Sequence, residues 1–323
     1  MGRSIILENI EEQLGMLLGD FSKLSPRIKH LTFDTKKCGD RINVQCSYIS
    51  FRDGQPTFDD FIETVADHII SFCLPRAVIR SAQKEIAAAD HVAASRIMRQ
   101  LTDQARALYI KAKKGSHRSG EAGEIVLYIL TEWLLQAPQI VSKMYLKTNN
   151  QMPVHGTDGI HTRYDSKTKR LHLYWGESKV HAKVGSALSS ALESIKEFVN
   201  NEYEKREIEI VAVHSDFDGF DSETKEAFLR YLDPYTEESN ERIVTHSCLL
   251  IFEFSCPKDT NPEEAEALFV KQTRETVESF IKSIKKNVEE KGLEPQRFEF
   301  FLMPVPSVQI FRDKFQGKIG WPK

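Results

Sequence analysis

Cysteines and long apolar segments are scarce in this chain. Its 323 residues hold five cysteines, and no two of them form a Cys-x-x-Cys pair. This usage disfavours a zinc ribbon or a dense disulfide framework and fits a reducing compartment. No run of roughly 18 apolar residues is present to span a membrane, and the first residues lack the apolar run of a secretion signal. We therefore expect a cytoplasmic protein that does not enter a membrane.

Several common catalytic signatures are also missing. There is no phosphate loop of the GxxxxGK[ST] type, no GxGxxG after a predicted strand and no GxSxG nucleophile turn. These absences leave the common nucleotide-binding and nucleophile-turn enzymes without support. The formal net charge is only −3, so any surface for nucleic acid must be a local patch.

The first third of the chain predicts a mixed region of strands and helices. Strands are expected at 28–34 and 41–48, a helix at 58–73 with Thr57 as its N-cap, and one or two helices within 76–113. The Gly/Ser/basic run 113–120 marks an internal boundary. We expect residues 1–110 to pack, as an N-terminal extension, on a core formed by residues 111–323.

The core predicts a mixed α/β (α+β) fold that begins with the order helix, three strands, helix, strand. These elements are expected at 121–136, at 141–147, on the two sides of a turn at 166–169, at 182–203 and at 207–214. The helix before 207–214 allows that strand to pair in parallel. A helix at 222–231, a strand at 247–254, a long helix at 262–291, a strand at 297–303 and a helical piece at 307–315 follow.

The register of the hairpin can be predicted from its alternation. With the turn centred on 166–169, facing residues have numbers that sum to 335, so that Asp158 lies opposite Glu177. One face then carries an apolar strip that includes Ile160 against Trp175, and the other face is mostly polar. Two carboxylates facing one another at the end of the apolar strip repel each other. A bound divalent cation is the simplest way to stabilise this arrangement.

The residues around this carboxylate pair suit the cleavage of a phosphodiester. Mg²⁺ (or Mn²⁺) takes oxygen ligands and can bind through one or two carboxylates, here Asp158 and Glu177, and the backbone carbonyl of Ser178 could add a third oxygen. Lys179 shares a strand face with Glu177. Its ammonium could orient or deprotonate the attacking water, or stabilise charge at phosphorus.

Further candidates precede the hairpin. Glu124, at the edge of the apolar stripe of helix 121–136, is the preferred additional catalytic acid and metal or water ligand, with Glu121 as a secondary candidate. A basic cluster that could contact nucleic-acid phosphates comprises Lys111, Lys113, Lys114 and Arg118. A solvated loop would explain the same cluster equally well.

A structural ion pair is the alternative for Asp158, Glu177 and Lys179. Glu-x-Lys alone carries little information, since Glu223-Thr224-Lys225 and Glu289-Glu290-Lys291 also match on predicted helices. The strand context, the Trp-Gly lead-in and the matching Asp158 favour catalysis. His155 and His161 flank Asp158, but without a third ligand at close spacing we favour loop and surface roles over zinc.

Three motifs in order resemble the PD-(D/E)xK nuclease superfamily and its restriction-endonuclease-like αβββαβ core, a mixed sheet flanked by helices. They are Gly123-Glu124, Gly156-Thr157-Asp158 and Glu177-Ser178-Lys179, within roughly residues 115–215. Gly-Thr-Asp stands where that superfamily has Pro-Asp. More narrowly, the segments SGEAGEI, HGTDGIH and WGESK resemble the HamA family, the nuclease subunit of the bacterial Hachiman anti-phage system. The resemblance implies a DNA-cleaving, metal-dependent effector that a helicase partner (HamB) restrains.

Two further functions remain open beside this nuclease. The first is a catalytically weak module with a nuclease fold that regulates or recruits a helicase. The second, a sequence-specific restriction enzyme, is disfavoured because residues 1–110 show no helix-turn-helix or zinc finger to read a sequence.

Overall fold

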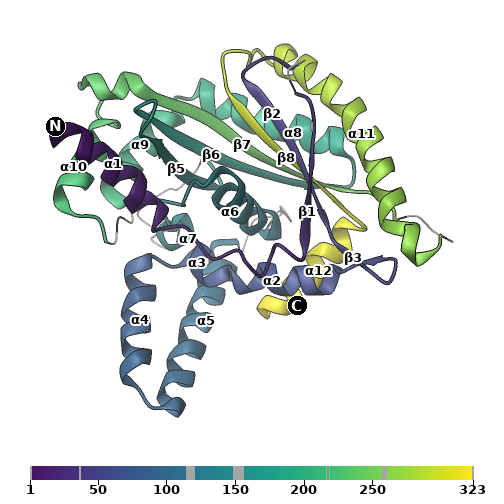
Figure 1. Cartoon of the computed structure of the whole chain (residues 1–323), viewed down its shortest axis with the longest axis horizontal. Helices are drawn as coiled ribbons and strands as arrows, with labels where there is room; N and C mark the ends of the chain where they lie inside the picture. The colour runs from purple at the N-terminus through teal and green to yellow at the C-terminus, as the bar shows by residue number, and fades with distance from the viewer. Residues whose placement is uncertain are drawn as a thin grey trace.

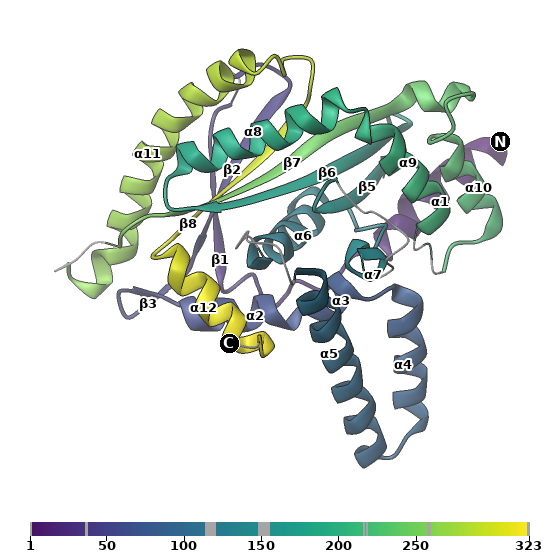
Figure 2. The same ribbon diagram turned by 180° about the vertical axis from the view of Figure 1, so that it is seen from behind.

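The computed structural model describes residues 2–35, 38–113, 121–147, 156–215, 217, 219–256 and 260–321. These residues form a six-stranded sheet with helices on both faces (Figure 1, Figure 2). The strands lie in the order β1 (Ile28–Thr32), β2 (Ile42–Ile49), β8 (Phe298–Val305), β7 (Arg242–Glu253), β6 (Arg170–His181) and β5 (Gly159–Asp165). β2, β8, β7 and β6 run parallel, and β1 and β5 are antiparallel edges. The predicted mixed α/β fold is confirmed, and its sheet joins strands from both ends of the chain.

The remaining elements connect these strands. The helices are α1 (Gly2–Gly15), α2 (Phe58–Asp67), α3 (Ile69–Cys73), α4 (Arg76–Ala88), α5 (His91–Lys113), α6 (Glu121–Leu135), α7 (Lys143–Lys147), α8 (Val184–Asn200), α9 (Tyr203–His214), α10 (Ser222–Arg230), the 3-10 helix η2 (Glu237–Glu241), α11 (Pro262–Glu290) and α12 (Val308–Ile319). A short hairpin pairs β3 (Phe51–Arg52) with β4 (Gln55–Pro56). No described helix combines the length and apolar character that a membrane span requires.

The sheet separates two layers of helices. α6 covers one face, where Leu127 packs in a common core with Leu249 of β7. α8 and α11 cover the other face, where Leu188 packs with Leu250. Neighbouring residues of a strand point to opposite faces, so Leu249 and Leu250 identify the α6 face and the α8 face.

A third core lies at the β5 edge of the sheet. Ile10 and Leu14 of α1, which the sequence did not predict, pack there with Trp175 and residues of α9 and α10. Between α9 and α10 lies a cavity of about 970 Å³. Its apolar lining comes from Val199, Ile208, Ala212, Leu229 and Leu232. α9 therefore has one face toward the core and another toward this cavity.

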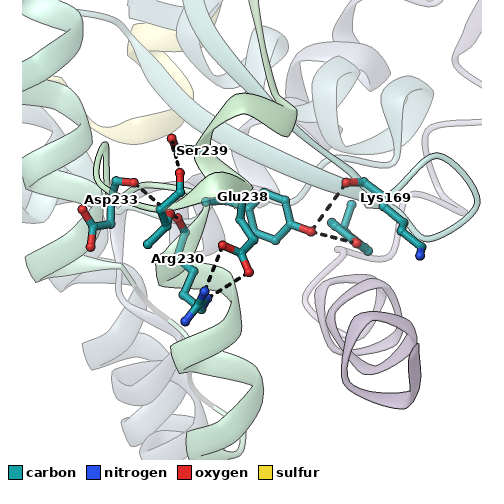
Figure 3. A network of polar contacts seen from close by, with 8 residues as sticks. Lys169, Arg230, Asp233, Glu238 and Ser239 are labelled. Carbon is teal, nitrogen blue, oxygen red and sulfur yellow. Dashed lines mark hydrogen bonds and ion pairs between the residues drawn. The ribbon is translucent and has the colours of Figure 1, made fainter. Parts of the chain in front are cut away.

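The predicted hairpin register is confirmed, because every β5–β6 pair from Gly159–Gly176 to Asp165–Arg170 sums to 335. The turn is held from the side of α10. The carbonyl of Lys169 accepts from the hydroxyl of Tyr231 at 3.5 Å, and the segment after α10 is closed by two hydrogen bonds, of 3.0 and 3.1 Å, from Arg230 to Glu238 (Figure 3). The end of the hairpin away from Asp158 is thus tied to its neighbours.

The strand predicted at 141–147 is wrong. Only Gln139 bridges to His161 of β5, with Ile140 N–H donating to the Ile160 carbonyl at 2.9 Å, and residues 143–147 form helix α7. Residues 141–144 are all buried, so they lack the alternation of a half-buried strand. Pro138 has no N–H, which limits the pairing before Gln139. The first strand of the predicted core is therefore reduced to one bridge.

The strand predicted at 207–214 is also wrong, because this segment is part of α9. Its buried residues are Glu207, Ile210 and Val211, which follow a helical spacing, whereas Val213 is 74% exposed. The place beside β6 is taken by β7, which pairs with it from Leu171 to His181. With β7 as its last strand and only a bridge in place of its first, the core runs α6, β5, β6 and α8, followed by α9, α10 and then β7.

The helix predicted at 58–73 is divided at His68 into α2 and α3. Thr57 precedes α2 but makes no side-chain cap hydrogen bond. Its buried hydroxyl instead donates to the carbonyl of Ser50 at 3.0 Å, so it links the helix start to the end of β2.

α4 and α5 form a hairpin that projects from the body of the molecule in both views (Figure 1, Figure 2). We call residues 76–113 the arm. The arm carries eight Lys and Arg residues against three Asp and Glu residues, in a chain of negative net charge. Lys84, Arg96 and Arg99 are exposed on it. The base is fixed by Arg76, which donates to the carbonyls of Gln139 and Leu17 at 2.7 and 3.1 Å.

Glu132 of α6 joins three segments beneath the sheet. Its fully buried carboxylate accepts from the N–H groups of Gly19 and Gln139 at 3.0 and 2.8 Å and lies 3.6 Å from Nη2 of Arg76. Burial raises the pKa of Glu132 to about 6, against the opposing effect of Arg76. The interaction closes the N-terminal segment and the arm onto the core.

We expect Glu132→Ala to lower the free energy of unfolding by about 3–5 kcal/mol, because it leaves the partners of a buried carboxylate unsatisfied. Glu132→Gln, which keeps one acceptor oxygen, should cost less. Denaturant titration measures both, with exposed Glu12→Ala as a control expected within about 0.5 kcal/mol of wild type. Equal stability of Glu132→Ala and the control would contradict this role.

Candidate metal and catalytic site

Asp158 lies immediately before β5, where the pairing of β5 with β6 ends. Its N–H donates to the carbonyl of Gly176 at 2.7 Å, and its Oδ2 accepts from the N–H of Ser178 at 2.8 Å. Beyond Gly176, β6 continues to His181 without a β5 partner. The Asp158 carboxylate therefore occupies the edge of β6 at the level of the sheet, where the next strand pair would have formed.

Gly176 permits this close approach of β5 and β6. A Cβ at this position would lie 3.0 Å from Cδ2 of Leu127 and 3.1 Å from the backbone nitrogen of Gly159. A side chain would have to displace either α6 or the start of β5. The glycine of the Trp-Gly-Glu-Ser-Lys segment thus keeps the Asp158 turn in contact with β6.

The backbone of Ser178 shares the edge with Asp158. Within a strand, the N–H and C=O of one residue point to the same side, so the Ser178 carbonyl points toward the Asp158 edge. The Val180 carbonyl, two residues on, shows the same direction, because it accepts from Nη2 of Arg312 at 2.8 Å. This is the direction that an oxygen ligand for a shared cation requires.

Glu177 and Lys179 lie on the α8 face and form an ion pair. Their side chains are largely buried, with 12% and 15% of the surface exposed. Ser194 of α8 also hydrogen-bonds to the Glu177 carboxylate. Burial, and then the negative charge of Asp158, raise the pKa of Glu177 to about 7, although Lys179 acts in the opposite direction. The two acids are therefore close enough to interact electrostatically.

Glu124 approaches β6 from the other face. The preceding residue, Gly123, touches the β6 side chains that point away from Glu177, since a Cβ there would lie 2.9 Å from Oγ of Ser178 and from Cγ2 of Val180. Glu124 itself is only 6% exposed, so it does not point into solvent. Side chains from the α6 face and from the α8 face of the sheet can both reach the edge of β6 that β5 leaves unpaired. The side chain of Glu121, the secondary candidate, lies outside the described residues.

Arg312 is a basic residue at this edge that the sequence did not single out. It reaches β6 from α12, and its charge, together with that of Lys179, helps lower the pKa of His181, after the effect of burial. The residue lies far from Glu177 in the chain, within an ordinary helical segment. Only the fold brings it to the site.

The other candidates divide between described and undescribed residues. Lys111 is exposed near the end of α5, whereas the side chain of Lys113 and the residues Lys114, Arg118 and His155 lie outside the described residues. His161 is buried beneath α6, with Nδ1 2.9 Å from the carbonyl of Ala137, and burial lowers its pKa to about 4. The loop or surface role predicted for His161 is therefore wrong, because the residue lies within β5 and is only 1% exposed.

A family model of HamA matches residues 26–319, which is nearly the whole chain. The chain belongs to the HamA family. This assignment confirms the resemblance to the HamA family carried by the segments SGEAGEI, HGTDGIH and WGESK, and it points to a Hachiman defence protein. No curated protein matches the chain. The HamA match spans both the N-terminal strands and α12, so the six-stranded sheet as a whole belongs to the family region.

The donor atoms at the β6 edge suit a hard divalent cation. Asp158, Glu177 and the Ser178 carbonyl are all oxygen donors, and Mg²⁺ commonly uses one or two carboxylates and keeps several waters. Among the described side chains, no group of three His, Cys, Asp or Glu residues is placed to hold a metal. The all-oxygen set with two carboxylates therefore fits Mg²⁺ or Mn²⁺ better than a closed structural zinc site.

The raised pKa of Glu177 predicts a pH-dependent stability without metal. The folded chain retains a proton on Glu177 between its ordinary pKa of 4.5 and about 7, whereas the unfolded chain loses it. The free energy of unfolding should therefore fall as pH rises through this window. Glu177→Gln, which resembles the protonated acid, should match wild type at pH ~5 and exceed it by about 1–3 kcal/mol at pH ~8 in EDTA. Denaturant titrations at both pH values measure this difference, and a constant offset would refute it.

Proposed function

We propose that this HamA-family chain is a metal-dependent nuclease that hydrolyses phosphodiester bonds in DNA. The observation that carries the proposal is the placement of Asp158 and Glu177 around the open edge of β6, with Lys179 paired to Glu177. A cation would stabilise two carboxylates that repel one another at a largely buried site. The ammonium of Lys179 beside them could stabilise the negative charge that develops when a phosphodiester is hydrolysed.

Each residue has a distinct role in this reaction. Asp158, Glu177 and the Ser178 carbonyl would hold Mg²⁺ or Mn²⁺, which supplies charge neutralisation at the phosphate and a more acidic water. Lys179 orients the attacking water and stabilises the charge that develops on the phosphoryl oxygens. Glu124, from the α6 face, would bind a water of the cation and not the cation itself, because the three acids do not form one cluster among the described side chains.

DNA is the proposed substrate, and the arm is the surface proposed to lie along it. Lys84, Arg96 and Arg99 project into solvent on the arm, and Lys111 is exposed near its end. In the sequence, the basic residues Lys113, Lys114 and Arg118 follow. Phosphate contacts from Lys and Arg require no particular base sequence. Such contacts would be sufficient for a nuclease that cleaves invading DNA of any sequence.

A helicase partner of the HamB type is proposed to restrain the nuclease, in the context of Hachiman defence. The alternative is that the chain is a catalytically weak module that regulates or recruits the helicase. Co-purification of the helicase with this chain would support a partner under either proposal. Cleavage by the complex distinguishes them, because the alternative predicts binding without metal-dependent digestion.

We expect Lys179→Ala and Glu177→Ala to reduce plasmid digestion with Mg²⁺ or Mn²⁺ by at least about 10²-fold, since each removes a preorganised charge at the reacting phosphate. The double variant Glu223→Ala/Lys225→Ala is a matched control, because it removes the same Glu-x-Lys pattern from exposed positions on α10. Melting curves and a helicase pull-down verify that fold and partner binding persist. Cleavage by Lys179→Ala at the wild-type rate would refute its catalytic role.

The arm predicts a specific change in salt-dependent DNA binding. Charge reversal at Lys84, Arg96 and Arg99 should reduce the slope of log affinity against log salt by about 0.9 for each phosphate that the arm no longer neutralises. Fluorescence anisotropy with labelled duplex DNA in EDTA measures the slope. The control reverses Lys282, Lys285 and Lys286 on α11, which gives the same change of net charge at other exposed positions. An equal effect of both triple variants would contradict a role for the arm itself.

A further inference from the structure

Lys143 and Glu207 form a buried ion pair behind the Asp158 turn. Nζ of Lys143 lies 2.7 Å from Oε1 of Glu207, and each side chain is only 1% exposed. The two residues come from α7 and α9, the two segments in which the sequence predicted strands. Burying both charges is costly, and an apolar pair of similar volume is often at least as stable. Stability alone therefore gives little reason for this pair.

The ammonium also holds the backbone next to Asp158. Nζ of Lys143 donates to the carbonyl of Thr157 at 2.8 Å and to its hydroxyl at 3.0 Å. Thr157 is buried and directly precedes Asp158. Three acceptors around one ammonium fix the direction of the Thr157 peptide, which an apolar side chain could not do.

Gly156 shows how closely this segment rests on the ion pair. A Cβ at Gly156 would lie 2.0 Å from Oε1 of Glu207, and the residue has a φ of +146°, which side chains rarely adopt. The backbone can reach the ion pair here only because glycine has no side chain.

Asp158 is therefore positioned from two sides. β6 holds it through the carbonyl of Gly176 and the N–H of Ser178. Lys143 holds it from behind through the preceding residue. A ligand that is fixed in this way loses little freedom when a cation binds, and partners behind metal ligands commonly influence affinity by about 10–100-fold.

We propose that Lys143 is a positioning residue that places the Asp158 carboxylate for cation binding, with Glu207 as its charge partner. This inference rests on the proposed function, because it gives Asp158 the role of metal ligand. Lys143 acts through Thr157 and does not touch the cation or the phosphate. Its removal should therefore weaken cation binding even where the fold is kept.

The test compares two buried ion pairs that are both replaced by apolar residues. Lys143→Met/Glu207→Leu removes the pair behind Asp158, and Arg76→Met/Glu132→Leu, which removes a buried carboxylate with its partly exposed arginine away from Asp158, is the control. Titration with Mn²⁺, followed by electron paramagnetic resonance of the free ion, gives the dissociation constant for each folded protein. We expect the first variant to bind Mn²⁺ about 10-fold or more weakly and the control to bind like wild type. Wild-type affinity in the first variant would overturn the proposal, as would an equal loss in both.

A second variant keeps all charges in place. Gly156→Ala introduces a methyl group against Glu207 and should weaken Mn²⁺ binding by a similar factor, whereas Gly185→Ala, where nothing lies within 4 Å of the new methyl, should not. This comparison decides the matter if the double variant does not fold, and unchanged affinity in Gly156→Ala then overturns the proposal. If wild type itself neither binds Mn²⁺ nor cleaves DNA, it is the proposed function that fails. A loss confined to the variants tests the positioning role alone.

Discussion

The pairing of β5 with β6 ends at Gly176 although β6 itself continues to His181, and the candidate site depends on this difference in length. A strand without a neighbour leaves N–H and C=O groups that must find other partners. Here Asp158 takes the N–H of Ser178, Arg312 takes the carbonyl of Val180, and the Ser178 carbonyl is directed to the same edge. Oxygen donors and basic groups collect at this edge because the sheet has stopped on one side only.

The arrangement of elements around this edge also explains why several acidic side chains are brought close together. Glu177 comes from the α8 face, Asp158 lies at the level of the sheet, and α6, which carries the buried Glu124, covers the opposite face. In the folded chain without metal, a proton on Glu177 removes the repulsion below about pH 7, and at higher pH the ion pair with Lys179 offsets part of it. A cation would replace the proton and leave Lys179 available for the phosphate. Under the proposed function, the charge arrangement that weakens the fold near neutral pH is also the one that a bound cation would stabilise.

The sequence was sufficient to predict the hairpin, because alternation fixes both the register and the residues that face one another. The same register predicted Asp158 directly opposite Glu177, whereas the pairing ends at Gly159–Gly176 and Asp158 lies at the edge of β6 instead. α7 and α9 were assigned wrongly, since their apolar residues fit either period and only the presence of β7 beside β6 excludes a strand at 207–214. Arg312 and the pair Lys143–Glu207 had no local signal at all. Contacts between residues so far apart in the chain depend on the packing of whole elements, which no single segment encodes.

α9 has a consequence for regulation because its two faces meet different surroundings. Glu207 faces inward to Lys143, while Ile208 and Ala212 line the cavity shared with α10. A ligand of that cavity that binds one position of α9 better than another would change the cation affinity of the Asp158 edge. By thermodynamic reciprocity, the cation would change the affinity of that ligand by the same factor. Under the proposed function, α9 would link binding in the cavity to cation binding at the Asp158 edge. A partner could then hold the proposed nuclease inactive without covering Glu177 or Lys179.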